Sequence, residues 1–353
     1  MNILIPCSKL YLTENNYNPF VRVIYNGLME RGFNVTCDVD EFWNNSKSYD
    51  IIFFQWPEEV FFWSNYDIQK FSSLLEMLKK CKIRIFATCH NEHAHNNNSE
   101  ANKLYEILYS QCDAMHHMGQ YSYKTLGIKY PSCHHFIVQH PIFYDIVSLQ
   151  LDRNKCRRKL GLPLNKIIIL AFGAFRNDEE KKLFLSLRNL GKKKDVLLVA
   201  PSLSKGRLYN GRLIHKTFKH IYERIKYYRT GIICNKGRID ETLIPLYFTA
   251  CDLVFIQRLE ILNSGNLPLA FSAGKVVIGP NKGNVGKILS ETGNPCFNPH
   301  NKEDVLKKAQ IGLEASQNSN LGKENYIYAQ KYMSQNVTMD SLAENILYFM
   351  ASK

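Results

Sequence analysis

Apolar and polar positions alternate along the chain in blocks that predict buried strands separated by amphipathic helices. In the first part of the chain, short apolar runs predict strands at residues 2–6, 33–38, 50–55, 83–89, 114–118 and 136–139. Helical spacing predicts helices at residues 20–31, 67–80 and 99–112 between them. Buried strands that alternate with helices are typical of βαβ units and a parallel sheet.

The same alternation restarts after residue 150. It predicts strands at residues 166–172, 195–200, 231–235, 253–257 and 276–279, and helices at 153–160, 179–190, 240–249, 267–273, 304–315 and 341–349. We therefore predict an α/β protein with two Rossmann-like domains, residues 1–150 and 151–335, whose parallel sheets face each other across a cleft. Residues 336–353 are expected to form a C-terminal helix that packs back on the first domain. Ligands of such sheets bind beyond the carboxyl ends of the strands.

One further segment, residues 212–229, combines an apolar stripe with a basic face. Its apolar residues recur at steps of three and four, at Ile214, Phe218, Ile221, Ile225 and Tyr228. This pattern favours a helix that covers a sheet and exposes its basic face to solvent. A helix that lies on a membrane surface is the alternative.

The most informative turn lies at Asn263, Ser264, Gly265 and Asn266, immediately before the predicted helix at 267–273. A turn of small residues at a helix start leaves backbone N–H groups directed outward at the positive end of the helix dipole. We expect these four residues to bind a phosphate or diphosphate. A plain helix N-cap by Ser264 is the simpler interpretation, and both can hold together.

Charge is distributed unevenly along the chain, which has a net charge of +13. Residues 1–150 contain 12 Lys and Arg against 15 Asp and Glu, whereas residues 151–353 contain 33 against 17. The positive field therefore belongs to the half that contains the phosphate-type turn. Such a field suits a nucleotide donor, a pyrophosphate-linked acceptor, an acidic membrane surface or nucleic acid.

Composition excludes several other classes of protein. The 353 residues are 45% hydrophobic, which is typical of a globular protein. The ten cysteines have no paired spacing, and several lie in apolar runs, as expected of reduced thiols in the cytosol. The first ten residues are interpreted as a strand and not a signal peptide, and no apolar run has the length of a membrane span. We expect a cytoplasmic protein that can associate with the inner face of a membrane.

Several motifs, taken in order, resemble a known family. The first half contains FFQWPE at residues 53–58, ATCHNEHAH at 87–95, CDAMHHM at 112–118 and QHPIFYD at 139–145. The second half contains RRKLGLPLNKIIILAFGAFRNDEEKK at 157–182 and NKGRIDETLIPLYFTACDLVFIQ at 235–257. Their order and spacing resemble the GT-B glycosyltransferases, and more narrowly the bacterial polysaccharide glycosyltransferases in or near glycosyltransferase family 4.

This resemblance implies an enzyme with the GT-B fold, in which the first domain binds an acceptor and the second a nucleotide sugar. The implied reaction moves a sugar, from UDP more than from GDP, to a saccharide or lipid-linked saccharide during surface polysaccharide biosynthesis. It also implies that neither a metal ion nor a cofactor is needed, because cationic side chains and a helix N-terminus stabilise the leaving diphosphate.

The chain departs from the family at two places. The glycine pair that follows the first strand in the family is replaced by Asn16, Tyr17, Asn18 and Pro19. The two-glutamate motif is missing, since Ile261 and Leu269 occupy its positions. Glu260 or Asn263 can substitute for the ribose contact, and whether the reaction retains or inverts configuration stays open.

The resemblance assigns candidate residues to the donor. Arg176 and Lys181, which competes with Lys182, are expected to neutralise the diphosphate next to Gly173, and Arg258 is a further candidate. The turn of Gly237, Arg238 and Ile239 is expected to present backbone to the nucleobase. Surface charge and a plain turn between strand and helix are the alternatives for these two groups.

Other residues are candidates for the acceptor and for proton transfer. The resemblance places His90 at the donor sugar or phosphate, with Glu92 or Glu58 as the base if the reaction inverts. It implies Asn18, Trp56 and Glu58 for the acceptor. Packing in the protein interior is the alternative for Trp56, and a hydrogen-bonded loop histidine is the alternative for His90.

Three other functions were weighed. The cluster of Cys89, His90, His93 and His95 matches no zinc-site spacing, so no metal is expected. A nucleotide-sugar epimerase on the same fold is an alternative, but it would need a carboxylate and a histidine facing the donor, and the sequence shows none near Asn263. Nucleic-acid binding rests on net charge alone, without a recognised motif, and no nucleic-acid partner is expected.

Overall fold

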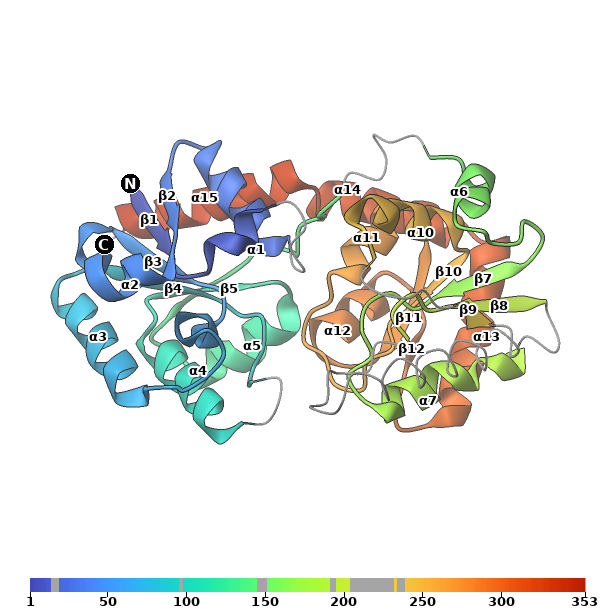
Figure 1. Ribbon diagram of the computed structural model, residues 1–353, viewed down its shortest axis with the longest axis horizontal. Coiled ribbons are helices and arrows are strands. Elements are labelled where there is room, and N and C mark those ends of the chain that lie inside the picture. Colours follow the sequence, from blue (N-terminus) through green and yellow to red (C-terminus); the bar gives the residue numbers. More distant parts are fainter. Residues whose placement is uncertain are drawn as a thin grey trace, which may run out of the picture. The chain divides into compact units, whose positions relative to one another are not determined.

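The computed structural model describes residues 1–13, 19–94, 98–144, 151–190, 195–203, 232–233 and 239–352. The chain divides into two compact units, the first formed by Met1–Phe143 with Lys331–Lys353 and the second by Tyr144–Gln330 (Figure 1). Residues 331–335 belong to the first unit in this division, whereas the sequence-based boundary lay after residue 335.

The first unit is built on a six-stranded parallel sheet. Its strands are β1 (Asn2–Ile5), β2 (Asn34–Cys37), β3 (Ile51–Phe54), β4 (Arg84–Thr88), β5 (Ala114–His117) and β6 (His134–Ile137). They lie in the order β2-β1-β3-β4-β5-β6. The residues of β3 are all buried, as expected when helices cover both faces of a parallel sheet.

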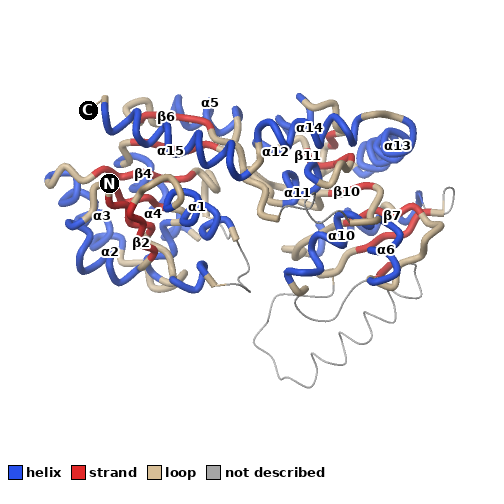
Figure 2. The backbone as a smooth tube through the Cα atoms, turned by 90° about the horizontal axis from the view of Figure 1, so that it is seen from above, coloured by secondary structure: helices blue, strands red, loops and turns tan. Residues whose placement is uncertain are grey.

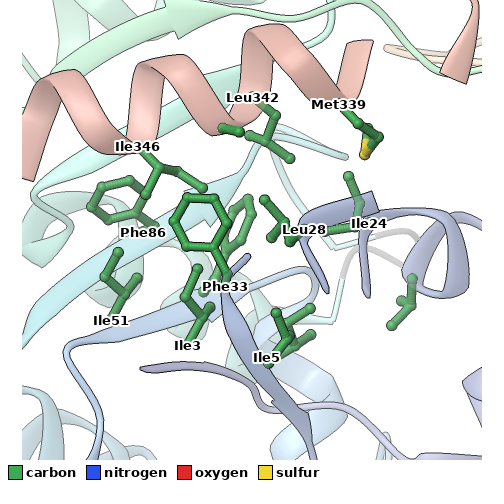
Figure 3. Packing of buried hydrophobic residues seen from close by; sticks show 14 of the residues in the cluster. Ile3, Ile5, Ile24, Leu28, Phe33, Ile51, Phe86, Met339, Leu342 and Ile346 are labelled. Atoms are coloured by element: carbon green, nitrogen blue, oxygen red, sulfur yellow. The ribbon is translucent and has the colours of Figure 1, made fainter. Parts of the chain in front are cut away.

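Two helices from opposite ends of the chain cover one face of this sheet. They are α1 (Phe20–Met29) and α15 (Gln335–Ala351), which lie on the same side of the strands in Figure 1. Figure 3 shows Met339, Leu342 and Ile346 of α15 directed toward Ile24 and Leu28 of α1 and toward the sheet. A Cβ atom at Gly27 of α1 would overlap the side chain of Met339, so the two helices pack closely.

The opposite face of the first sheet packs on α2 (Val39–Asn45), α3 (Ile68–Lys80) and α4 (Ser99–Gln111). Phe42 of α2 and Phe71 of α3 both make ring contacts with Phe54 of β3. The remaining elements of the unit are α5 (Gln120–Lys129) and three 3₁₀ turns, η1 (Lys9–Leu12), η2 (Ser46–Ser48) and η3 (Pro57–Phe61). η1 and η3 follow the carboxyl ends of β1 and β3, where ligands of parallel sheets bind.

The second unit contains another six-stranded parallel sheet. Its strands are β7 (Ile167–Leu170), β8 (Val196–Val199), β9 (Ile232–Ile233), β10 (Leu253–Phe255), β11 (Val276–Pro280) and β12 (Cys296–Phe297), in the order β12-β11-β10-β7-β8-β9. Figure 2 shows β11, β10 and β7 following one another in this order. The carboxyl ends of β7 and β10 are therefore neighbours.

Helices cover both faces of the second sheet. The side chains of α7 (Asp178–Ser186) and α13 (Lys302–Asn318) enter the apolar core on one face. The other described elements are α6 (Arg153–Lys159), η4 (Glu241–Leu243), α10 (Ile244–Ala250), α11 (Asn266–Ser272), α12 (Gly283–Glu291) and α14 (Leu321–Tyr332). In Figure 1, α6 and α10 lie on the opposite side of the strands from α7 and α13.

A buried arginine joins these elements at the start of the sheet. The side chain of Arg157 is fully buried and donates hydrogen bonds to the carbonyl oxygens of Ala250 and Lys166 at 2.9 and 2.8 Å. It also pairs with Asp252 at 2.7 Å, and the same carboxylate oxygen accepts the backbone N–H of Ile168 at 2.7 Å. Arg157 therefore stabilises the junction of α6, β7 and β10.

These observations confirm the predicted α/β class and most of the predicted elements. The sequence analysis did not predict α2, α5, α14 or the short strand β12. The predicted helix at 212–229 lies outside the described residues. Among the helices that the structure describes, none is long and apolar enough to cross a membrane.

Candidate functional site

The loop between β7 and α7 is the centre of the candidate donor site in the second unit. Gly173 in this loop has φ of +88°, a left-handed conformation that costs other residues about 1–2 kcal/mol. A Cβ atom at Gly173 would lie 3.9 Å from Nδ2 of Asn266. Gly173 and Asn266, both expected at the donor, therefore lie close together.

Three side chains hold this loop by donating to its carbonyl oxygens. Gln257, which is buried, donates to the oxygen of Phe172 at 3.1 Å, and Asn266 donates to the same oxygen at 2.9 Å. Arg258 donates from Nη1 to the oxygen of Ala174 at 2.8 Å. Residues after β10 and at the start of α11 thus fix the backbone of the loop, as a preorganised site requires.

Glu180, like Gln257, is a residue of this site that the sequence did not reveal. It is 2% exposed, and its Oε2 accepts both Nη1 of Arg258 and the backbone N–H of Arg176 at 2.7 Å each. Burial lowers the pKa of Arg258, and the charge of Glu180 opposes that shift. Within the described part of the chain, Nη2 and Nε of Arg258 make no hydrogen bond. In the sequence, a glutamate in the acidic first turn of a helix gives no signal that it binds a distant arginine.

The start of α7 is occupied by its own acidic residues. Asn177 caps the helix by accepting the N–H of Glu180 at 2.8 Å, and Asp178, Glu179 and Glu180 fill the first turn. Lys181 pairs with Asp178 at 3.2 Å. Negative charge at this N-terminus satisfies the helix dipole, so an anion near the loop has to rely on Arg176, Lys181 and Arg258.

The small-residue turn after β10 also uses some of its own backbone donors. The hydroxyl of Ser264 accepts the N–H of Asn266 at 3.3 Å, and its carbonyl oxygen accepts the N–H of Leu267 at 3.2 Å. Gly265 occupies the N-cap position of α11 and has no side chain that could cap the helix. Ser264 therefore satisfies two N–H groups of the first turn that the phosphate interpretation left for a ligand.

Gly283, the first residue of α12, packs directly against the segment that precedes the turn at Asn263. A Cβ atom at Gly283, where φ is +57°, would overlap the carbonyl oxygen of Ile261. Asn284 donates from Nδ2 to the side-chain oxygen of Asn263 at 2.8 Å. Leu269, which replaces a family glutamate, is buried in α11. Its side chain belongs to the apolar core.

Glu260 lies in a separate exposed cluster. One carboxylate oxygen is 3.2 Å from Nζ of Lys282 and 3.8 Å from Nε2 of His300. This pairing supplies a carboxylate and a histidine in the second unit, which the sequence analysis did not detect. Ile239 is half-buried just before η4. Gly237 and Arg238 lie outside the described residues.

The candidate residues of the first unit gather at the carboxyl ends of β3 and β4. The ring of His90 stacks on Trp56 with centroids 4.2 Å apart and contacts Phe20 edge-on at 4.6 Å. Nε2 of His90 lies 3.1 Å from Oε1 of Gln55, a buried residue that the sequence analysis did not single out. Trp56 is 6% exposed, so its indole packs mainly inside this cluster.

Glu58 and Glu92 have different surroundings. Glu58 is 2% exposed, and burial raises the pKa of its carboxyl to about 7, while a hydrogen bond with Tyr105 acts in the opposite direction. Its Oε2 has no hydrogen-bond partner in the described structure. Glu92 is half-buried and accepts the hydroxyl of Thr125 at 3.2 Å. Asn18 lies outside the described residues.

Metal-ligating side chains do not gather into a candidate metal site within the described ranges. Within them, His, Cys, Asp and Glu residues form no group of three that could hold a metal ion. His95 of the histidine cluster weighed above lies outside those ranges.

Comparisons with known proteins identify the fold. No protein-family model matches the chain, and no curated protein matches it by sequence. Among solved structures, sucrose-phosphate synthase from Thermosynechococcus elongatus is similar with a TM-score of 0.75 and 12% identity, covering 100% of this chain and 99% of the other. The HepE protein of Anabaena in complex with UDP-glucose is similar with a TM-score of 0.70 and 11% identity, covering 98% and 99%.

The chain has the GT-B fold. The prediction of this fold class is confirmed by these structures and by the two parallel sheets. A putative UDP-N-acetylglucosamine 2-epimerase from Listeria monocytogenes is also similar, with a TM-score of 0.61 and 11% identity over 100% of this chain and 97% of the other. At these identities the likeness extends to the fold and leaves the activity to be argued from the residues.

Proposed function

We propose that the chain is a glycosyltransferase that transfers a sugar from a nucleoside diphosphate sugar, UDP more than GDP, to a saccharide or lipid-linked saccharide. The observation that carries this proposal is the loop 171–176 on a GT-B fold. Gly173 lets the backbone turn there, and Glu180 fixes Arg258 beside it with two guanidinium nitrogens that bind no described residue.

The charge of the second unit supports an anionic donor. Residues 144–330 contain 31 Lys and Arg against 16 Asp and Glu. A diphosphate at the loop would meet Arg258 and the cations Arg176 and Lys181. Such preorganised charge stabilises a leaving diphosphate in the absence of metal. The HepE structures in complex with UDP and UDP-glucose, on the same fold, favour UDP as the carrier.

The proposed reaction needs a base if configuration inverts. Glu58, whose pKa burial raises to about 7, and Glu92 remain the two candidates, because a base works best when its pKa is near the working pH. In this proposal His90, stacked on Trp56, contacts the donor sugar or its phosphate. The enzyme would act in surface polysaccharide assembly, as a relative of the transferases in or near glycosyltransferase family 4, at the inner face of a membrane.

Nucleotide binding tests the first step. Thermal unfolding of the full chain should be measured with millimolar UDP, GDP, ADP and CMP, because a ligand that binds only the folded state raises its melting temperature. We expect UDP to give the largest increase. Arg258→Met should reduce the UDP effect, whereas the exposed Arg188→Met should leave it unchanged. Equal stabilisation by all four nucleotides, or none by any, would contradict the proposal.

Turnover tests the second step. Purified protein should be incubated with UDP-glucose, UDP-galactose and UDP-N-acetylglucosamine, with and without a saccharide acceptor, and release of UDP followed. Transfer predicts acceptor-dependent release of UDP. Binding of UDP together with interconversion of two UDP-sugars, without release of UDP, would instead favour the second candidate, a nucleotide-sugar epimerase. The Glu260 and His300 pair is the observation that keeps that candidate open.

A further inference from the structure

An aromatic cluster on the first unit has features that the donor site does not explain. Tyr11 of η1 stacks on Trp56 with centroids 6.0 Å apart and an interplanar angle of 24°. Trp63, which follows η3, also contacts Trp56, and the centroids of these two rings are 6.4 Å apart. Three large rings from two separate segments thus form one cluster, which we call the aromatic platform, and within it Trp56 is buried while Trp63 is 44% exposed.

A single buried carboxylate orients this platform. Glu59 is 3% exposed, and its Oε2 accepts the hydroxyl of Tyr11 at 3.3 Å and the indole N–H of Trp63. Its Oε1 accepts the backbone N–H of Ser8 at 3.5 Å. Burial raises the pKa of Tyr11, and Glu59 raises it further, so the phenol stays a hydrogen-bond donor. Glu59 therefore fixes the edges of two rings whose faces it does not cover.

The backbone at the platform is strained. Phe62 and Trp63 both have positive φ, at 49° and 63°, a conformation that costs bulky residues about 1–2 kcal/mol each. The strain places both side chains outside the core, since Phe62 is 62% and Trp63 44% exposed. Strain of this kind concentrates at ligand-binding segments, and exposed aromatic patches mark interaction sites.

The geometry points to the aromatic platform as a saccharide-binding subsite, with Trp63 stacking on a neutral sugar ring and Glu59 as the residue that positions it. A pyranose has an apolar face of C–H bonds, which fits the electron-rich face of an indole, and a polar rim of hydroxyls. In the proposed function this sugar ring belongs to the acceptor, so the assignment to an acceptor rests on that proposal. The platform would then recognise the saccharide part of the acceptor.

The charge around the platform argues against lipid as the occupant. The first unit contains 14 Lys and Arg against 16 Asp and Glu, a net charge of −2. Attraction to an anionic bilayer depends on clustered basic residues, each worth about 1 kcal/mol near the surface. The charged group that contacts the platform in the described structure is instead the carboxylate of Glu59. A neutral ligand with hydroxyl groups suits such a surface better than an anionic headgroup.

Binding of neutral sugars to the full chain, without nucleotide, tests the subsite. Saturation-transfer NMR and calorimetric titration should use cellobiose, maltose and N,N′-diacetylchitobiose as probes. We expect at least one to bind, and Trp63→Ala to weaken that binding by about tenfold. Glu59→Gln should weaken it less, because the indole stays but loses its anchor. Tyr348→Ala, which removes a more exposed aromatic side chain on α15 (67% against 44% for Trp63), should have no effect.

Three results would overturn the subsite: no probe binds, Trp63→Ala binds as tightly as wild type, or Tyr348→Ala weakens binding equally. Sedimentation with phosphatidylglycerol vesicles that is lost in Trp63→Ala, without sugar binding, would assign the platform to lipid. Thermal stabilisation by UDP monitors the second unit in the same samples. Its failure would remove the proposed function and leave the platform standing, whereas sugar-binding failure alone would remove only the platform. If Trp63→Ala does not fold, Trp63→Leu, which keeps an apolar side chain but lacks the indole, should weaken sugar binding as well.

Discussion

The two units contain sheets with equal numbers of strands and the same parallel pairing, yet their buried and half-buried carboxylates have different partners. In the second unit, Glu180 and Asp252 each pair with an arginine at 2.7 Å. In the first unit, Glu58 and Glu59 bind aromatic side chains and backbone, and burial raises the pKa of both. The second unit therefore pairs these carboxylates with arginines, whereas Glu58 and Glu59 of the first unit form no ion pair with a described residue.

This difference suits different ligands. Paired arginines retain their charge and hold a geometry that an anion can meet without reorganisation. Carboxyls in an aromatic setting attract no anion but can exchange a proton near neutral pH. We therefore propose an anion-binding site in the second unit and a neutral, hydroxyl-binding site in the first. The following variants test whether the pairing causes this contrast.

The largest effect is expected at Arg157. Arg157→Met removes a fully buried guanidinium and leaves Asp252 without one of its partners, so we expect a loss of about 3–5 kcal/mol in the free energy of unfolding. Urea denaturation of Arg157→Met and of wild type should be compared with that of Arg158→Met, which changes the exposed neighbour and should cost less than about 0.5 kcal/mol. Equal stability of Arg157→Met and wild type would show that the pair does not stabilise the second unit.

A smaller, more local effect is expected at Glu180. Glu180→Gln keeps the shape but weakens the hold on Arg258 and on the N–H of Arg176, so UDP affinity should fall by about 30- to 100-fold. Calorimetric titration with UDP measures this, and Glu179→Gln, an exposed neighbour, is the control. Because Glu180 acts through Arg258, Arg258→Met combined with Glu180→Gln should lose little more than Arg258→Met alone. Additive losses would mean that the two residues act independently.

Sequence alone predicted the architecture because strand and helix periods are local. The apolar run around Ile51 and the stripe of Phe71, Leu75 and Leu78 identify their elements without tertiary information. Partners distant in sequence were not predictable. The sequence predicts a helix around Arg157 but not its link to Asp252, which spans 95 residues. It likewise gives no signal for Glu180, whose carboxylate binds Arg258, 78 residues away.

The candidate sites show the same limit. The sequence located the loop after β7 and the turn at Asn263, because glycine and small residues mark turns locally. It did not reveal that Ser264 uses two of the N–H groups of that turn, or that Glu59 connects Tyr11 to Trp63. The link through Glu59 depends on side-chain geometry across elements, whereas the Ser264 contacts are local and depend on the backbone conformation of the turn. The assigned roles of the site residues stay predictions until they are measured.

The smallest effect, and the sharpest test of the first unit, is the pH dependence caused by Glu58. Its folded pKa of about 7 lies above the unfolded value near 4.5, so the folded state binds more protons between these values. The stability that Glu58 contributes is therefore present below pH 4.5 and is lost as the pH rises through 7, by about 2 kcal/mol between pH 5 and 7. Glu58→Gln, which cannot titrate, should lack this decline, while Glu92→Gln should retain it. Urea denaturation at pH 5, 6 and 7 gives the three slopes. Parallel slopes for wild type and Glu58→Gln would show that Glu58 is already ionised in the folded first unit, and the contrast between a titratable and a fixed-charge unit would then fail.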